Sequence, residues 1–595
     1  MRYRAPGTST LEGALTTACM TDVPDAGGLP DQAGPPRTPI SSYWWTYCAA
    51  LASVVLLAGG LLHIALRGHA GLLAVPLAIA LLLGYAIWRR VLELRAHRDL
   101  PGPRPSFFLG NLGSLLSCGH GGRDRALLEL HRAHGPIVRL HMAWGSAPFV
   151  SVSRVSDNLR RKDVDSNRRA DGTILPRSLM GLPRGETHRR HRHELGPYFT
   201  PRAARSGAGR MAEVSRLYLE TWRRGRTRHG TLPADLHHWS AHSLGVFLAG
   251  KDWAAGEDLS RYLDAIAGLE EVISTRTFHP FFVRWLLPRQ RARARAAYRH
   301  LFDRFSDLLA RREREPDAGE DVLGHLTRLG DRWSRAERVE EMISLVAGGT
   351  DAMSYTVAQA LVLLSQHPTI QDEARAQVAA LSAGAPPPPL LLHVIEETVR
   401  LYPPVPFSSK VSPGGGVVEL GHHIPAGTNI MWMKTAVGRD AANFRDAERF
   451  DPGRFVCPGQ SMAQALPFGA GPRHCIGRGL AELNCASLLA AILRELDVVP
   501  APVEGVTFTA TVSVTPSAVP VRLVPRLDAH APRSGCPAVT SGCAASIGRQ
   551  CPAPDEPSSI DPSSHNHTKR VSSDQTYCRD HGSRCRRFAP RLPVR

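Results

Sequence analysis

One stretch, residues 467–477 with the sequence PFGAGPRHCIG, places a single cysteine at the end of a glycine-rich loop. The strongly apolar segment 479–496 follows it, and this continuous pattern predicts a buried helix. A thiol at a helix N-terminus meets the positive end of the helix dipole and unpaired backbone N–H groups. We therefore expect the thiolate form of Cys475 to be favoured, which would make this side chain a metal ligand.

The residues around this cysteine suit a flat, anionic partner. Gly471 and Gly477 would let the backbone approach such a cofactor closely. Arg473 could pair with an anionic group on it, and Phe468 could cover the sulfur. An isolated cysteine in a Gly/Pro turn is more often a small buried apolar residue. The interpretation therefore depends on the spacing of all the fixed residues around the cysteine.

The spacing FxxGxRxCxG resembles the haem-binding signature of the cytochrome P-450 family. All five fixed positions are filled, by Phe468, Gly471, Arg473, Cys475 and Gly477. The resemblance implies haem b as cofactor and Cys475 as the axial ligand of its iron, with the other four residues around the haem. It also implies a mainly α-helical fold with a minor β sheet.

A second motif brings an acid and an arginine together. Glu397 and Arg400 are three residues apart, on one helical face, and Tyr402-Pro403-Pro404 follows soon after. This pattern resembles the ExxR motif of the same family. The family's third partner is an arginine in a Pro-x-Arg-Phe motif, which Arg454 supplies within 452–455. The resemblance implies a buried ionic network of Glu397, Arg400 and Arg454 that braces the cysteine loop and helps to retain the cofactor.

Three further positions match the places where family members bind the haem propionates. Arg192 matches an arginine of a basic helix-like stretch. His188, one turn earlier, stands where the family has a tryptophan, and it could still donate a hydrogen bond. Lys410 takes roughly the place of another arginine, and it supplies charge without a bidentate fork.

The long apolar segment 342–364 predicts a helix that contains two adjacent glycines, Gly348 and Gly349. Each costs about 1 kcal/mol in a helix interior relative to alanine, so a close approach or local widening should require them. The resemblance makes this the helix that crosses the distal face of the haem. Counting back from Gln366-His367-Pro368, the family's acid falls on Asp351 and its threonine on Ala352.

Ala352 is a departure from the family pattern at a catalytic position. The threonine hydroxyl of family members helps to deliver protons to bound dioxygen, and a methyl group cannot form that hydrogen bond. Thr350 and Ser354 point away around the helix, whereas Thr356 lies one turn along on the same face. Three alternatives remain. A substrate hydroxyl or a water could complete the delivery of protons to dioxygen. The enzyme could instead use a peroxide or an oxygenated substrate, or its oxygenation could be inefficient.

Composition excludes few functions. The chain has 595 residues and a formal net charge of +18, but its arginines are spread along the chain without a long basic run, so we expect no nucleic-acid partner. Five of the eleven cysteines lie in a polar tail, and the few others favour a reducing compartment. No flavin or nucleotide motif is present, so electrons from NADPH would arrive through a separate reductase.

The N-terminal part predicts a membrane anchor. Residues 1–42 have the composition of a disordered extension, and 43–88 contains two apolar runs. The first, 43–66, predicts a transmembrane helix with aromatic residues at its start, while the second is near the lower limit for a span, so one span or two remain open. Basic residues and prolines in 89–105 predict a stiff hinge, as in microsomal members of the family.

The arginines after the apolar runs place the rest of the chain in the cytosol by the positive-inside rule, which favours the endoplasmic reticulum membrane. Residues 106–527 form the predicted haem-thiolate catalytic domain, and 528–595 a disordered tail. The prediction is thus a membrane-anchored monooxygenase that acts on a lipophilic small molecule. The alternatives are a haem-thiolate isomerase, dehydratase or peroxygenase, because of Ala352, and a haem-binding protein without turnover.

Overall fold

The computed structural model describes one stretch of the chain with several gaps. It covers residues 70–526 except 112–121, 142–147, 157, 159–173, 184, 226–231, 254–258, 279–286, 316–318, 383–384, 457–460, 504–505, 507 and 511–512. The predicted N-terminal extension, the first apolar run and the C-terminal tail lie outside the described residues.

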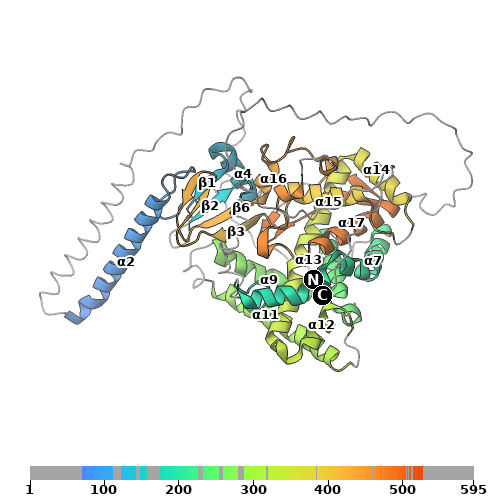
Figure 1. Cartoon of the computed structure of the whole chain (residues 1–595), viewed down its shortest axis with the longest axis horizontal. Coiled ribbons are helices and arrows are strands. Elements are labelled where there is room, and N and C mark those ends of the chain that lie inside the picture. The colour runs from blue at the N-terminus through green and yellow to red at the C-terminus, as the bar shows by residue number, and fades with distance from the viewer. Residues whose placement is uncertain are drawn as a thin grey trace, which may run out of the picture. The chain divides into compact units, whose positions relative to one another are not determined.

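Helices dominate the described part of the chain, which confirms a mainly α-helical fold with small β sheets (Figure 1). The helices are α2 (Ala70–Ala96), α4 (Gly122–His134), α6 (Glu186–Leu195), α7 (Pro201–Arg223), α8 (Leu232–Ala249), α9 (Leu259–Phe278), α11 (Pro288–Glu313), α12 (Val322–Leu329), α13 (Arg335–Gln366), α14 (Pro368–Ala379), α15 (Pro389–Leu401), α16 (Lys434–Arg439) and α17 (Arg478–Glu495).

The larger of the described sheets has four strands in the order β1-β2-β6-β3. Strands β1 (Ile137–Leu140), β2 (Phe149–Val152), β6 (Asn429–Met433) and β3 (Phe407–Val411) pair antiparallel, except that β2 and β6 run parallel. Two-stranded sheets join β4 (Val417–Glu419) to β5 (His422–Ile424), β7 (Leu496–Pro500) to β10 (Val521–Pro525), and β8 (Phe508–Ala510) to β9 (Val514–Pro516).

Helix α13 is the longest described helix, and it runs beside α15 and α17 (Figure 1). A capping box starts it: the Ser334 hydroxyl accepts the Glu337 N–H while the Glu337 carboxylate accepts the Ser334 N–H. Gly349 lets α13 approach α8, because a Cβ there would lie 2.6 Å from a methyl carbon of Leu244. The close approach predicted for the paired glycines is therefore present at Gly349.

The start of the predicted hinge 89–105 differs from the expectation. Helix α2 continues to Ala96, so the first half of this segment is helical, and only the proline-rich half from Pro101 to Pro105 lacks regular structure. Arg90 is buried, and its guanidinium donates to the Phe107 carbonyl and to Glu93. Helical propensity carries the chain through Arg89, Arg90 and Arg95, and the helix ends at Ala96, before Arg98 and the prolines.

No helix among the described residues is long and apolar enough to cross a membrane. The first predicted apolar run, 43–66, lies outside the described residues, whereas the second, 72–88, lies within α2.

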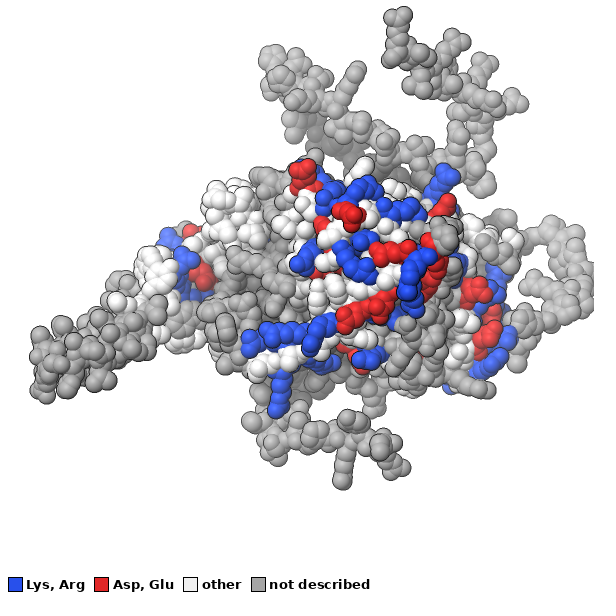
Figure 2. Space-filling view, turned by 90° about the horizontal axis from the view of Figure 1, so that it is seen from below, with Lys and Arg blue, Asp and Glu red and all other residues white. Residues whose placement is uncertain are grey.

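Charged side chains form a mixed surface rather than a patch of one sign. Figure 2 shows acidic and basic side chains intermixed over the face that it draws. Several described arginines pair with carboxylates, such as Arg338 and Arg335 with Glu313, and Arg190 with Glu337. These ion pairs balance part of the positive charge locally.

Candidate active site

The cysteine loop is a tight turn between a 3-10 helix, η8 (Gly471–Arg473), and the N-terminus of α17. The Cys475 N–H donates to the Phe468 carbonyl at 2.9 Å, which closes the loop on itself. Gly469 and Gly471 have φ of 72° and 71°, a left-handed conformation that favours glycine. A Cβ on Gly477 would lie 4.0 Å from the Cys475 sulfur, which is an ordinary van der Waals contact.

Cys475 combines an exposed side chain with the electrostatics of a buried one. Solvent reaches the residue, yet burial among surrounding protein atoms raises the pKa of its thiol. The helix N-terminus is thus not sufficient to favour the thiolate, because desolvation outweighs it, and that expectation from the sequence is corrected. The Gly477 N–H, Lys434 and Arg192 act in the opposite direction and lower the pKa.

The sequence did not indicate that Lys434, the first residue of α16, lies at the site. It is buried, and its ammonium donates to the Pro467 carbonyl at 2.9 Å, at the start of the cysteine loop. Burial lowers the pKa of Lys434 to about 8, and the charge on Cys475 acts to raise it. No local pattern marks Lys434, since its partners lie in a different segment of the chain.

Two predicted arginines hold the loop from the side of α6. Arg192 donates to the His474 carbonyl at 2.8 Å and contacts the His474 ring nitrogen at 2.7 Å. Arg473 donates to the carbonyls of Leu179 and Leu182 at 3.2 and 2.6 Å. Both guanidiniums therefore lie beside the cysteine loop, where they bond main-chain oxygens in this structure.

His188 and Lys410 are both buried. Lys410 lies on β3, and its ammonium donates to the Asn158 carbonyl at 3.3 Å. His188 lies one turn before Arg192 on α6. Their predicted contact with haem propionates stays a prediction.

Glu397, Arg400 and Arg454 meet in one buried network. The Glu397 carboxylate accepts from Arg400 at 2.6 and 2.7 Å and from Arg454 at 2.8 Å. The same carboxylate accepts the Asp451 N–H at 2.9 Å. The two guanidiniums also donate to carbonyls of residues 438, 445–447 and 449, so the network joins α15 to the segment before the cysteine loop.

Helix α13 is mostly buried but accessible around its glycine pair. Gly348 is exposed, a Cβ built on it meets nothing within 4 Å, and the residues Ala347, Gly349, Asp351 and Ala352 are partly exposed. The helix is buried again from Met353, where Cys485 of α17 contacts its carbonyl at 3.9 Å. Residues 347–352, apart from the buried Thr350, therefore form an accessible window, which we call the α13 window.

Asp351 has polar partners that the sequence did not indicate. Its carboxylate accepts from the Ser513 hydroxyl at 2.8 Å and lies 3.5 Å from the His237 ring. The Ser513 hydroxyl also lies 3.1 Å from the Glu270 carboxylate. A hydroxyl thus adjoins Asp351, although position 352 has only a methyl group.

The hydroxyl groups of α13 near this window bond their own helix. Thr350 donates to the Val346 carbonyl, Ser354 to the Asp351 carbonyl and Thr356 to the Ala352 carbonyl. The helical geometry expected from the sequence, in which Thr350 and Ser354 point away from Ala352, agrees with these contacts. None of the three hydroxyls replaces the missing threonine directly.

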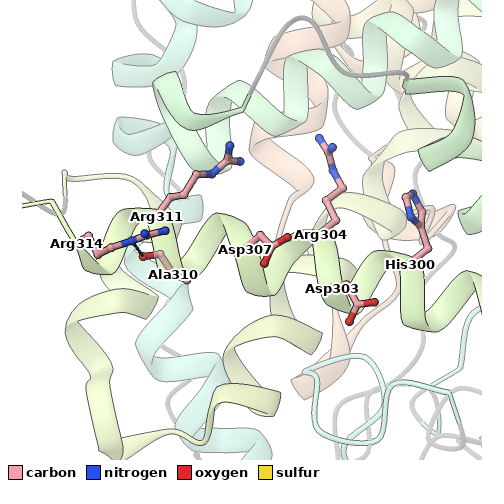
Figure 3. Close-up of a pocket in the computed structure, with 7 residues that line it drawn as sticks. All are labelled: His300, Asp303, Arg304, Asp307, Ala310, Arg311 and Arg314. Atoms are coloured by element: carbon pink, nitrogen blue, oxygen red, sulfur yellow. Dashed lines mark hydrogen bonds between the residues drawn. The ribbon is translucent and has the colours of Figure 1, made fainter.

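A separate hollow of about 540 Å³ lies along α11 (Figure 3). Its lining alternates acids and bases: His300, Asp303, Arg304, Asp307, Ala310, Arg311 and Arg314. None of the predicted site residues lines it. An open groove along one charged helix is unsuited to an apolar cofactor.

Comparison with known proteins decides the family. A profile described as Cytochrome P450 matches residues 100–518, well over half of the chain. This chain belongs to the cytochrome P450 family. It is a monooxygenase-type oxidoreductase of that family, and the extent of the match agrees with the motifs found from Pro101 onward.

Curated relatives are similar to this P450 over most of their length. The chain is 28% identical to the mitochondrial 25-hydroxyvitamin D-1 alpha hydroxylase of Rattus norvegicus over 454 residues, covering 69% of this chain and 90% of the relative. It is 29% identical to cyclooctat-9-en-7-ol 5-monooxygenase of Streptomyces melanosporofaciens over 397 residues, covering 62% and 84%. Probable cytochrome P450 4s3 of Drosophila melanogaster is 28% identical over 448 residues, covering 68% and 87%.

The P450 family implies a haem-thiolate cofactor, and the residues present fit it. Within the described ranges, no group of three or more His, Cys, Asp or Glu side chains could hold a metal ion. Haem needs only one such ligand here, because the porphyrin supplies the others. Cys475 offers an accessible sulfur in a protein interior, and cationic Arg192, Arg473, Lys410 and Lys434 are suited to an anionic macrocycle and its thiolate.

Proposed function

We propose that this P450 inserts one oxygen atom from O2 into a lipophilic small molecule, with electrons from NADPH delivered by a separate reductase. The observation that carries the proposal is the accessible Cys475 sulfur, held in a loop that the buried Glu397 network braces. When bound, haem with a thiolate ligand supplies the activation of O2.

The protein's own side chains would hold this chemistry in place. Cys475 would bind as thiolate, with the Gly477 N–H, Lys434 and Arg192 favouring its charge. Asp351 at the α13 window would hold a proton-carrying water or substrate group, and Ser513 adjoins it. The buried network would keep the loop from shifting when substrate enters.

The substrate class is supported by the α13 window. Its accessible residues are small, mainly Ala and Gly, and the helix on either side is buried and largely apolar. An apolar molecule would fit such a surface better than a highly charged one. The names of two relatives describe a hydroxylase and a monooxygenase, which supports oxygen insertion rather than another redox reaction.

The electron donor would approach from the side of the cysteine loop. Arg473 belongs to the loop, Arg192 donates to it, and the exposed Arg478 directly follows it. These charges would attract an acidic surface on a reductase. Membrane lipid would be the other partner: the apolar runs within 43–88 and the arginines after them support an anchor in the endoplasmic reticulum with the catalytic domain facing the cytosol.

A second candidate function follows from Ala352. Without the threonine hydroxyl, an isomerase, a dehydratase or a peroxygenase with the same cofactor needs no proton delivery to O2. The presence of Ser513 beside Asp351 makes oxygen activation the better supported choice.

Two measurements test the proposal. The reduced protein with carbon monoxide should give the absorption band typical of a thiolate ligand; a band typical of a neutral ligand would refute the assignment of Cys475. A library of lipids should then give oxygenated product with reductase and NADPH. Product formed only with hydroperoxides would favour the second candidate, and a thiolate spectrum without any turnover would favour a haem-binding protein.

The variant Ala352→Thr tests the role of the missing hydroxyl. If proton delivery limits the reaction, the variant should convert a larger fraction of the NADPH consumed into product. If this fraction is unchanged, this chain's own groups already complete the delivery of protons.

A further inference from the structure

The carboxylate of Glu341, in the first half of α13, holds two groups from outside its own helix on a single oxygen. The Leu179 N–H donates to Oε1 of Glu341 at 2.5 Å, and Nδ1 of the His191 ring lies 2.6 Å from the same oxygen. Glu341 and His191 are both fully buried. A carboxylate that is removed from water requires such donors. These contacts therefore join α13 to the turn before α6 and to α6 itself.

The first route from Glu341 to the cysteine loop runs through the backbone of Leu179. The N–H of Leu179 bonds Glu341, and its carbonyl accepts from Arg473 of the cysteine loop at 3.2 Å. Arg473 also donates to the Leu182 carbonyl at 2.6 Å. The Leu182 N–H donates in turn to the Ser178 carbonyl at 2.8 Å, which closes this turn on itself. The turn is thus a bonded connector between α13 and the loop.

The second route runs through α6. The His191 ring, which contacts Glu341, stacks on Trp333 with the ring centroids 3.6 Å apart, and this stack fixes its orientation. The next residue, Arg192, donates to the His474 carbonyl at 2.8 Å. Successive residues of a helix point about 100° apart. Helix α6 therefore contacts Glu341 with one side chain and the cysteine loop with the next.

Both routes end on adjacent residues of the cysteine loop. Arg473 and His474 directly precede Cys475, and each is bonded to a segment that Glu341 holds. On the other side of Cys475, α17 packs against α13, where the thiol of its second cysteine lies 3.9 Å from the Met353 carbonyl. Contacts that lead to α13 therefore hold the chain before and after Cys475.

We propose that Glu341 is a positioning residue that fixes the cysteine loop relative to α13. Glu341 lies seven residues, or about two helical turns, before Gly348, so it shares a face of the helix with the α13 window. A displacement of this part of α13 would be passed to the loop through both routes. The inference rests on the proposed function for what Cys475 does, whereas the contacts that carry it do not involve the sulfur.

The neighbouring Glu340 provides a matched comparison. It is as fully buried as Glu341, and its carboxylate accepts from the backbone N–H and the guanidinium of Arg177 at 2.7 and 2.8 Å. It also accepts from the Tyr298 hydroxyl at 3.0 Å. Each acid thus holds two segments, but only the groups held by Glu341 lead to Arg473 and His474 by the hydrogen bonds described above.

Hydrogen exchange of the backbone amides in 467–478 of the full-length holoprotein measures how firmly the loop is held. Glu341→Met removes the acceptor at a similar side-chain length, and we expect it to speed this exchange about tenfold. It should also increase the share of the carbon monoxide band that is typical of a neutral ligand. Glu341→Gln keeps an acceptor oxygen without the charge, so its exchange should lie between wild type and Glu341→Met. Glu340→Met should leave the exchange of 467–478 and the spectrum unchanged.

Unchanged loop exchange in Glu341→Met would overturn the proposal, and so would an equal acceleration in Glu340→Met. If Glu341→Met does not fold, His191→Phe decides the question. This variant keeps a ring to stack on Trp333 but removes the nitrogen that contacts Glu341, and unchanged exchange in 467–478 would again overturn the proposal. A wild-type protein without the thiolate-type carbon monoxide band would refute the proposed function instead, and the exchange measurement would still test how the loop is held.

Discussion

Glu397 joins three segments through a single carboxylate. Its oxygens accept from Arg400 on the same helix, from Arg454 and from the Asp451 N–H, and the Glu397 side chain is fully buried. Arg400 also stacks 5.1 Å from the Phe444 ring. Both guanidiniums are buried with it, and both pair with this carboxylate.

We therefore expect Glu397→Gln to lower the free energy of unfolding by about 3–5 kcal/mol, because it removes the charge of the carboxylate that pairs with two buried guanidiniums. Denaturant unfolding and the amount of haem retained on purification would measure this. Glu213→Gln is a matched control: Glu213 pairs with Arg216 on the surface, so the change should stay within about 1 kcal/mol. Equal effects of the two variants would contradict the bracing role.

The pKa of Glu396, next to Glu397, predicts how the stability of the protein depends on pH. Burial and the neighbouring Glu482 raise the pKa of Glu396 from 4.5 to about 7, and Arg478 only partly opposes this. Between these two values the folded protein holds a proton that the unfolded chain has lost. Stability should therefore fall as the pH rises from about 4.5 to about 7, and then level off.

Glu396→Gln should flatten this part of the stability curve, since glutamine stays neutral at every pH. Melting temperatures between about pH 5 and about pH 7.5 would show a smaller decline in the variant than in the wild type. Glu482, whose pKa burial also raises, would keep some slope in both proteins. An identical slope in both would mean that Glu396 ionises normally in the folded state.

Helix α7 offers a test of packing at the scale of an element. Gly207 is buried, and a Cβ there would lie 2.6 Å from the Phe247 ring of α8. Gly209, on the same helix, has nothing within 4 Å of its Cβ position. The two glycines differ only in what faces them.

We expect Gly207→Ala to destabilise the protein by about 1–3 kcal/mol, because α7 and α8 must separate or the ring must turn. Gly209→Ala should stabilise it by up to about 1 kcal/mol, because alanine favours the helix. Unfolding by denaturant would compare them. Stabilisation by both substitutions would show that the α7–α8 contact is looser than the structure has it.

Helix α2 is fastened to the sheet by a polar cluster at its C-terminal end. Glu93 accepts from buried Arg90 at 2.5 Å and from His141, which follows β1, at 2.9 Å. His97 bonds the Thr428 hydroxyl just before β6 at 2.8 Å. The end of α2 is therefore held by several contacts to the sheet.

Glu93→Gln should loosen this attachment, since the ion pair between Glu93 and buried Arg90 is lost. Hydrogen exchange of the backbone amides in 89–100 would be faster in the variant, while exchange in α13 would be unchanged. Glu220→Gln, which removes only a surface pair with Arg224, is the control. Unchanged exchange in 89–100 would show that the cluster does not hold the helix.

Across the whole molecule, local patterns could be predicted and distant contacts could not. The cysteine loop and the Glu397–Arg400 pair each lie within a few residues, so spacing alone marks them. Arg454 was found only through the resemblance, because its bond to Glu397 spans 57 positions. The helices over 342–364 and 479–496 followed from apolar runs, which are a local signal, whereas the mainly helical fold followed from the resemblance.

The missed residues share a physical reason. Lys434 reaches Pro467 across 33 positions, and Ser513 reaches Asp351 across 162. Neither has a neighbouring partner in the sequence, so their chemistry arises only when the chain is folded. The pKa of Cys475 was misjudged for the same reason, since desolvation depends on atoms from many segments.

The remaining prediction is that the whole molecule is attached to a membrane. It depends on the lengths of the two apolar runs. At about 1.5 Å per residue, a helix over 43–66 would cross a hydrocarbon core of about 30 Å, whereas one over 72–88 would barely reach across it. We expect the full chain to stay in the membrane fraction after an alkaline carbonate wash. Deletion of 43–66 should release most of it to the supernatant.

The same deletion also distinguishes an anchor with one transmembrane span from an anchor with two. A chain without 43–66 that resists the wash would mean that 72–88 crosses the membrane by itself. Release by salt alone would instead indicate attraction between the arginines after the apolar runs and anionic lipid, without insertion. A full chain that never sediments with membranes would contradict the anchor, while the haem site, which lies in a different part of the chain, would be unaffected.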